Sequence, residues 1–181
     1  MTCSLADHFR AMARNNAWSN ARLLDACVRL SDEEFTAERV SFFPSLQQTL
    51  NHILLVDRNY LADLVGTGRA ALQEYEPLLR AADLAVAQTV KDHQLVAFCD
   101  TVTEADLDRI IPIDRSEGVA YRETVSAVLT HLFVHQIHHR GQAHAMLSGT
   151  GVAPPQLDEF FLASDTPRRN IELRRLGLSA C

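Results

Sequence analysis

Apolar residues recur along this chain mostly at helical spacing, in long stretches separated by glycine and proline. Four stretches are long enough to predict helices, with expected limits of 4–30, 45–65, 82–101 and 121–148. The looser segment 102–120, with its alternating IIPID, predicts a short strand or hairpin, and LDEFFLA near the C-terminus predicts one more short helix. The pattern therefore predicts an all-α protein, a four-helix bundle with a short C-terminal helical segment.

The apolar stripes of these helices define the expected core. In the third helix the inward-facing residues are expected to include Val86, Val90, Leu95 and Phe98. In the second helix Asp57 falls within a stripe of leucines, where an ionisable group needs a partner. Asp57 is therefore a candidate metal ligand, a hydrogen-bond acceptor behind a ligand, or one half of a buried salt bridge.

Length and charge limit the classes of protein to consider. A chain of 181 residues suits one domain, residues 1–181, with a substantial core. The composition, 47% apolar and 22% charged, is ordinary for a globular protein. A formal net charge of −6 argues against a general nucleic-acid-binding role, which needs a basic face. The Arg-rich TPRRNIELRRLGL is a local exception, and we expect a solvated terminal segment there.

Cysteine usage and hydropathy predict a cytoplasmic protein without a membrane partner. Cys3, Cys27, Cys99 and Cys181 form no CxxC motif and no close pair, which favours reduced thiols. Cys27 and Cys99 fall in helical apolar patterns, so buried and inert thiols are expected. No apolar run approaches the roughly 20 residues of a membrane span, and no signal-peptide pattern is present.

Histidines are concentrated in the fourth predicted helix, where HLFVHQIHHRGQAH (131–144) holds five of the eight. His135 and His139 stand four residues apart, which places both side chains on one helix face. Two such imidazoles can hold a metal ion when a third ligand comes from elsewhere, and His52 is the best outside candidate. On a helical wheel of about 100° per residue, His139 lies within the apolar stripe and His135 at its edge. A metal site there competes with an ordinary pair of buried, hydrogen-bonded histidines.

The wheel separates the remaining histidines from this pair. His131 precedes His139 by eight residues, a rise of about 12 Å, so we expect it behind the ligands or in the cavity wall. His138 points about 100° away from His139 and is expected to face solvent or another element. His52 lies more than about 100° from the centre of its own apolar stripe, so periodicity does not decide its role.

The residues present exclude two familiar metal chemistries. HQIHH is superficially similar to the zinc-protease motif HExxH, but Gln136 takes the place of the general base, and an amide cannot accept a proton as a carboxylate does. Di-iron bundle sites need Glu-x-x-His pairs, and no glutamate here has a histidine three positions later.

Three segments together resemble the DinB family. HLFVHQIHHRGQAHAML, followed by GxxPPQLDEFF, is similar to the C-terminal half of that family; RNNAWSNARLLDACVRLSDEEF is similar to its first helix, and LNHILLVDRNYLADLVG to its second. The likeness spans most of the chain, and HHRGQ is fairly specific in this context. The resemblance implies a four-helix bundle, often a homodimer, in which three histidines hold a divalent metal ion. Those ligands map onto His52, His135 and His139.

The resemblance also implies zinc or nickel as the metal, and transfer of low-molecular-weight thiols in related members. The expected function is therefore a metal-dependent enzyme that activates a small thiol, as a thiol S-transferase does. A metal-dependent hydrolase that activates water is the alternative enzyme. The alternative of a different class is a non-catalytic metal-binding or structural stress-response protein, in which the ion joins the second helix to the fourth.

Several other residues are candidates for the surroundings of the site. Gln142 lies on the cavity side, one turn beyond His138, and is expected to orient a ligand. Arg140 is a candidate for contact with a substrate anion, and a surface salt bridge is its simpler role. Trp18, Asn16 and Asn20 are candidates for the cavity mouth, against ordinary packing and helix-surface roles. The residues do not identify the substrate.

Overall fold

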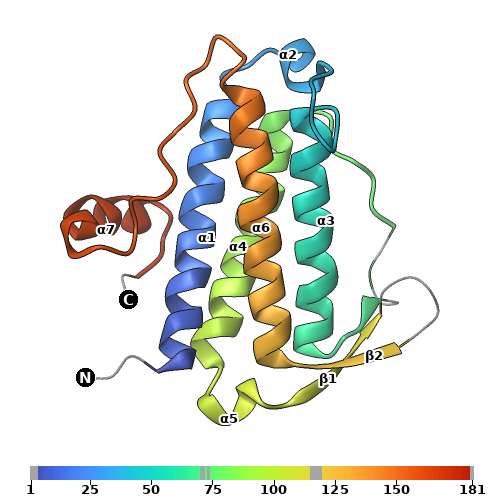
Figure 1. Cartoon of the computed structure of the whole chain (residues 1–181), viewed down its shortest axis with the longest axis vertical. Coiled ribbons are helices and arrows are strands. Elements are labelled where there is room, and N and C mark those ends of the chain that lie inside the picture. Colours follow the sequence, from blue (N-terminus) through green and yellow to red (C-terminus); the bar gives the residue numbers. More distant parts are fainter. Residues whose placement is uncertain (1–3, 70–71, 73, 115–119, 180–181) are drawn as a thin grey trace.

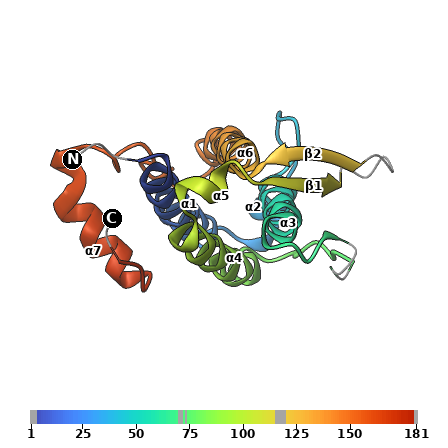
Figure 2. The same ribbon diagram turned by 90° about the horizontal axis from the view of Figure 1, so that it is seen from below.

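Four long helices pack side by side in the computed structural model of the chain, which describes residues 4–69, 72, 74–114 and 120–179 (Figure 1). They are α1 (Leu5–Cys27), α3 (Leu46–Val65), α4 (Ala81–Thr101) and α6 (Val125–Leu147). Both α1 and α3 contact α4 and α6, so the four helices form a bundle when seen end-on (Figure 2). The predicted all-α four-helix bundle is confirmed. None of the described helices is both long and apolar enough to cross a membrane.

Short elements close the two ends of the bundle. At one end α2 (Asp32–Thr36) lies between α1 and α3 (Figure 1). At the other end α5 (Glu104–Leu107) and the strands β1 (Ile110–Asp114) and β2 (Ala120–Thr124) connect α4 to α6. The strands pair antiparallel, with Ile110 opposite Thr124. The hairpin predicted for this looser segment is therefore present.

Capping side chains explain where the long helices begin. Ser4, Ser45 and Thr124 each accept a hydrogen bond from the backbone N–H three residues later, which satisfies a donor that the first turn leaves unpaired. α3 ends at Gly66, whose φ of 81° suits glycine. The predicted start of the fourth helix at Tyr121 is wrong, because Tyr121–Thr124 belong to β2.

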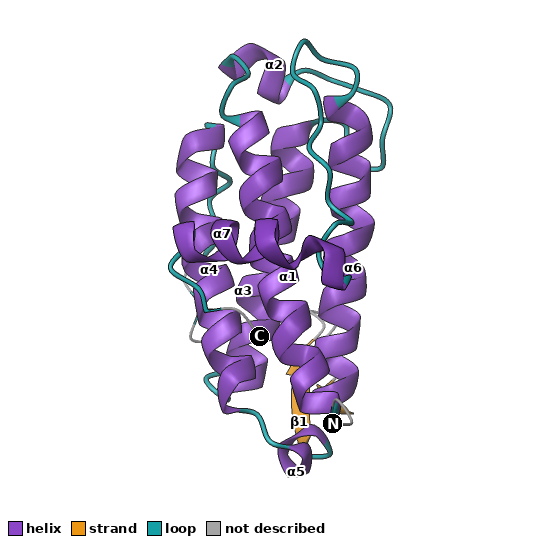
Figure 3. Cartoon of the chain, turned by 90° about the vertical axis from the view of Figure 1, so that its left-hand side faces the viewer, coloured by secondary structure: helices purple, strands orange, loops and turns teal. Residues whose placement is uncertain are grey.

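The C-terminal helical segment lies later in the chain than predicted. Residues 157–162 form no regular element, and Phe160 is buried against Trp18. A 3-10 turn, η2 (Ala163–Asp165), leads instead into α7 (Thr166–Arg175), which lies across the outside of α1 (Figure 3). The Arg-rich segment expected to be solvated thus forms a helix, favoured by a proline in its first turn and by an Arg168–Glu172 pair at i,i+4.

A buried polar layer separates two apolar clusters of the core. One cluster gathers around residues such as Trp18 and Leu129, and the other around residues such as Leu50 and Leu84. The polar layer between them consists of Asn16, Asn20, Asp57, Gln88, Asp92, Gln136 and Arg140, all of which are buried. Buried polar groups are costly unless they are hydrogen-bonded, so the layer depends on its internal contacts.

The polar layer also explains an error in the predicted face of α4. Val86 and Val90 are 69% and 51% exposed, whereas Gln88 and Asp92 are buried. The inward face of α4 carries two polar residues four positions apart, so the apolar pattern placed Val86 and Val90 on the wrong side of the helix. Leu95 is buried as predicted.

Amide groups bridge the two carboxylates of the layer. Asp57 accepts hydrogen bonds from Gln136 and, at 2.7 Å, from Nε2 of Gln88. The same Gln88 nitrogen lies 3.1 Å from Oδ1 of Asp92. Asp92 Oδ1 also accepts from the two asparagines of α1, at 3.1 and 2.9 Å. Asp57 therefore lies inside a network of amides, at the boundary between the two apolar clusters.

Arg140 is the cation of the layer. Its Nη1 donates to Asn16, to Asn20 at 3.0 Å and to Gln136 at 3.2 Å. The surface salt bridge considered for Arg140 is wrong, because the residue is only 4% exposed. Burial lowers the pKa of Arg140 to about 10, against the opposing influence of Asp92 and Asp57. The guanidinium therefore stays charged at neutral pH and faces both carboxylates.

Burial shifts the titration of both carboxylates upward. It raises the pKa of Asp57 to about 6, although Gln88 and Gln136 donate to it. Burial and the nearby charge of Asp57 together raise the pKa of Asp92 to about 7. Because both values lie above the ordinary 3.8, the folded chain binds more protons than the unfolded chain between about pH 4 and 7. Their contribution to stability is complete below about pH 4 and is lost as the pH rises through the folded-state values.

We expect Asp92→Asn to flatten this pH dependence. Asparagine keeps an Oδ1 acceptor for the three amide donors but has no titrating proton. The unfolding free energy of the variant should therefore fall less between about pH 4 and 8 than that of the wild type. Urea denaturation at a series of pH values measures the slope. Asp83→Asn, at an exposed position of the same helix, is the matched control and should keep the wild-type slope. An unchanged slope in Asp92→Asn would contradict the titration of Asp92.

Candidate metal centre

Three histidines meet where α3 packs against α6. His52 comes from α3, and His135 and His139 come from successive turns of α6. One ring nitrogen from each lies within 4.8 Å of the others. Nε2 of His52 is 2.9 Å from Nε2 of His135. The structure thus brings together the pair that helical spacing indicated and the third residue that the family resemblance implied.

The separations between these nitrogens suit a divalent metal ion. A zinc–imidazole bond is about 2.0–2.1 Å long, so two nitrogens of a tetrahedral site stand about 3.3 Å apart. The spacing found here, from 2.9 Å to at most 4.8 Å, brackets that value. Small side-chain rotations would equalise the separations, and three ligands leave room for a further one.

The surroundings keep the three imidazoles neutral. Burial, together with the neighbouring His139 and His52, lowers the pKa of His135 to about 3. Burial is also the main cause that lowers the pKa of His52 and of His139. Neutral imidazole is the form that binds a metal ion, so no proton has to leave at neutral pH.

Gln142 sets the orientation of His139. Its Oε1 lies 2.7 Å from Nδ1 of His139, so the Nδ1–H group donates to the amide oxygen and Nε2 keeps its lone pair. A hydrogen bond of this kind holds the ring of a metal-binding histidine in place. Nε2 of Gln142 lies 3.1 Å from Nε2 of His138, which is exposed as expected. The contact with His139 is what an orienting role would need, and that role of Gln142 stays a prediction.

We expect Gln142→Ala to weaken metal binding by about 10- to 100-fold, because His139 would lose the acceptor that holds its ring. Gln142→Glu keeps an oxygen acceptor for the same N–H and should retain most of the affinity. Titration of zinc in competition with a chromophoric chelator measures both variants. The orienting role is wrong if Gln142→Ala binds zinc as tightly as the wild type.

Phe43 covers one side of the cluster. Its ring centroid lies 4.5 Å from that of His52 and 5.6 Å from that of His139. Phe42, which is 77% exposed, packs edge-on against Phe43 at 4.9 Å. Apolar periodicity does not reveal this pair, because it lies in an irregular connection. Two adjacent phenylalanines just before a histidine-bearing helix were the available signal.

His131 and Asp57 lie near the cluster without joining it. The His131 side chain is exposed, with its ring centroid 5.3 Å from that of Tyr60 and 6.3 Å from that of His135. His131 therefore borders the site. The expectation was a position behind the ligands or in the wall of a cavity. Asp57 is held by amides in the polar layer and is not one of the three grouped residues.

Trp18 and Asn20 lie deeper than a cavity mouth. Trp18 is 1% exposed, packs against Phe160 and donates from Nε1 to Glu172. Asn20 belongs to the polar layer, where it bridges Asp92 and Arg140. Both residues therefore have packing and hydrogen-bonding roles in this structure.

Two of the four cysteines are in the described part of the chain, and both are buried as expected. Burial raises the pKa of Cys27 and of Cys99 to about 12, so neither thiol ionises near neutral pH. Cys3 and Cys181 lie outside the described residues. Neither buried cysteine therefore supplies a nucleophile to the cluster.

Comparison with known proteins gives consistent matches. The model of the DinB family matches residues 2–170. Protein DinB of Bacillus subtilis (strain 168) is 26% identical over 150 residues, which are 79% of this chain and 86% of that protein. The uncharacterized protein YizA of the same strain is 26% identical over 118 residues, 64% of this chain and 71% of YizA.

Two solved structures share the bundle fold. A DinB-like protein from Bacillus cereus ATCC 10987 superposes with a TM-score of 0.61 at 22% identity, covering 78% of this chain and 89% of that one. A DinB-like protein from Bacillus subtilis, YjoA, gives a TM-score of 0.62 at 20% identity, covering 83% and 97%.

Proposed function

The chain belongs to the DinB family, and on that premise we propose that His52, His135 and His139 bind one divalent metal ion, zinc or nickel. The observation that carries this proposal is the approach of three ring nitrogens to within 4.8 Å of one another. Imidazole suits both metals. The lowered pKa values of all three rings and the contact from Gln142 to His139 support the same role.

We further propose that the site activates a small thiol, as in a thiol S-transferase. The grouped ligands are three neutral imidazoles, with no carboxylate among the described residues of the group. A dication held in this way keeps its full charge, and when bound it supplies a Lewis acid for a thiol or for water. The three histidines hold and orient the metal ion, and Phe43 shields one side of the cluster from water.

The surroundings favour a thiol over water as the nucleophile. Asp57, the one carboxylate considered for the site, is enclosed in the buried polar layer and cannot serve as a general base for the cluster. A free thiol has a pKa of about 8.5 and water one of about 15.7, so a thiol loses its proton far more readily without such a base. Hydrolysis is therefore the second candidate.

The test compares metal-loaded and metal-free protein with glutathione or cysteine and a panel of carbon electrophiles. Turnover should require the metal and the thiol together, and His135→Ala should lack it. His8→Ala, at an exposed histidine of α1, is the matched control and should keep it. Turnover without any thiol would favour the hydrolase.

A cobalt-loaded sample separates an enzyme from a structural metal site. If the metal keeps an accessible position, addition of a thiol should change the visible spectrum of cobalt, because sulfur becomes a ligand. An unchanged spectrum, together with no turnover for any electrophile, would support a structural metal that joins α3 to α6.

A further inference from the structure

A separate cavity of about 480 Å³ lies between α1, α6 and the loop 156–161. The residues of α6 that line it are Ile137, Arg140, Gly141 and His144. On a helical wheel their mean direction is roughly 170° from that of His135 and His139. The cavity and the candidate metal centre therefore lie on opposite faces of α6.

Polar groups without partners converge on this cavity. Oγ of Ser19 is buried and finds no hydrogen-bond partner among the described residues. Asn15, one turn earlier on α1 and 7% exposed, has a side chain without a hydrogen bond to any described residue. Fully buried polar atoms are almost always paired, so the unpaired Oγ of Ser19 in the wall of a cavity points to a missing ligand.

Arg140 presents one edge of its guanidinium to the same cavity. All of its hydrogen bonds to the polar layer leave from Nη1. Within the described part of the chain, its Nε and Nη2 have no acceptor, and the residue lines the cavity. An Nε–Nη2 edge matches the two oxygens of a carboxylate.

Gly141 provides room beside Arg140. It lies in the middle of α6, where glycine weakens a helix relative to alanine. A Cβ built at Gly141 meets no atom within 4 Å, so packing against the described residues does not require glycine. The missing side chain enlarges the cavity instead.

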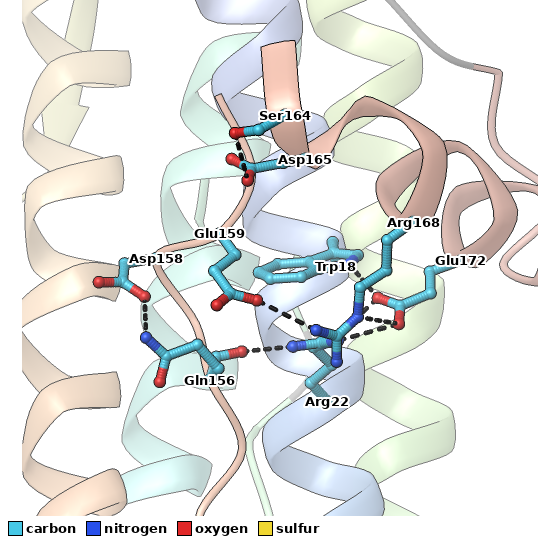
Figure 4. Close-up of polar contacts among 9 residues, drawn as sticks. All are labelled: Trp18, Arg22, Gln156, Asp158, Glu159, Ser164, Asp165, Arg168 and Glu172. Atoms are coloured by element: carbon cyan, nitrogen blue, oxygen red, sulfur yellow. Dashed lines mark hydrogen bonds and ion pairs between the residues drawn. The ribbon is translucent and has the colours of Figure 1, made fainter. Parts of the chain in front are cut away.

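The loop that forms the third wall is fastened to α1, as Figure 4 shows, and also to α6. Arg22 donates to the carbonyl of Gln156 at 2.6 Å and pairs with Glu172 at 2.9 Å. His144 lies 2.9 Å from the carbonyl oxygen of Pro155, so its Nε2–H donates to that oxygen. The cavity is therefore preformed, which lowers the entropic cost of binding.

We propose that this cavity binds a small organic monocarboxylate with an apolar body. The carboxylate pairs with the free edge of Arg140 and accepts a hydrogen bond from Ser19. The apolar body packs on Ile137, Leu157 and Phe161. Asp158 also lines the cavity, and its negative charge disfavours a phosphate or a dicarboxylate. This site is additional to the proposed metal function and independent of it.

The test is a titration of the metal-free full chain, followed by amide NMR, with hexanoate and phenylacetate as probes. Saturable shifts are expected at Ser19 and Gly141. Hexanamide has nearly the shape of hexanoate but no charge. Its affinity should be lower by about tenfold or more, because the charged hydrogen bonds are lost. Inorganic phosphate should also bind more weakly than either carboxylate.

Variants locate the binding. Gly141→Leu should abolish the shifts by filling the cavity, and Ser19→Ala should weaken binding without unfolding the chain, since its Oγ has no partner to lose. Ala145→Leu, at an exposed position of α6, is the matched control and should bind as the wild type does. No saturable shift up to about 10 mM, or unchanged binding in Gly141→Leu, would overturn the proposal. Equal affinity for hexanamide and hexanoate would overturn it too. Shifts that depend on protein concentration in the absence of ligand would also overturn it, because they indicate that a second copy of the chain occupies the cavity.

Discussion

Replacement of His139 by alanine is expected to lower the affinity for zinc by more than about 100-fold. Loss of a group that merely orients a ligand costs about 10- to 100-fold, and His139 is proposed as a ligand itself. Without it, His52 and His135 offer two nitrogens, fewer than the three of a usual catalytic zinc site. The remaining pair cannot enclose the ion.

Competition with a chelator and metal analysis after gel filtration measure this loss. His8→Ala provides the control, because it removes an exposed histidine far from the cluster in sequence. Circular dichroism of both variants establishes that the bundle is intact. Stoichiometric zinc in purified, folded His139→Ala would rule out the proposed site.

Arg140→Met is expected to lower the free energy of unfolding by about 3–5 kcal/mol, the usual cost of removing one partner from a buried charged network. Methionine fills much of the same space, but it leaves Asp57 and Asp92 without their cation. It also leaves the oxygens of Asn16 and Gln136 without a donor. An unpaired buried charge or polar group costs far more than an intact pair contributes.

Urea denaturation at neutral pH measures this effect, and Arg168→Met is the matched control. Arg168 pairs with Glu159 and Glu172 on the surface, where such pairs are worth at most about 1 kcal/mol. Adding Asp92→Asn to Arg140→Met should restore part of the lost stability, because one of the two buried charges is removed. Equal losses in Arg140→Met and Arg168→Met would show that the polar layer does not depend on its cation.

Local signals explain which parts of the fold could be predicted from sequence. Apolar periodicity located the four long helices, and Ser45 and Gly66 marked the ends of α3 to within a residue, because capping depends only on neighbouring groups. The inward face of α4 could not be found in this way. Gln88 and Asp92 face inward only because residues of α1 and α3 supply their hydrogen bonds, and those partners lie far away in the chain.

The same distinction applies to the candidate site. His135 and His139 were recognisable as a pair because one turn of a helix sets their relation. Periodicity placed His52 off its own apolar stripe, and the family resemblance alone selected it. Its position beside α6 follows from the way α3 packs across the bundle, as does the cover provided by Phe43.

By itself, then, the sequence determined the helices, the bundle class and one pair of adjacent imidazoles, all of which depend on contacts within a few residues. Only the tertiary structure decided that His52 meets this pair, that Arg140 is buried among amides, and that a cavity opens on the face of α6 opposite the histidines. The physical reason is that these features depend on which helix faces pack together. That choice is made by the summed burial and hydrogen bonding of the whole core, which no local pattern contains.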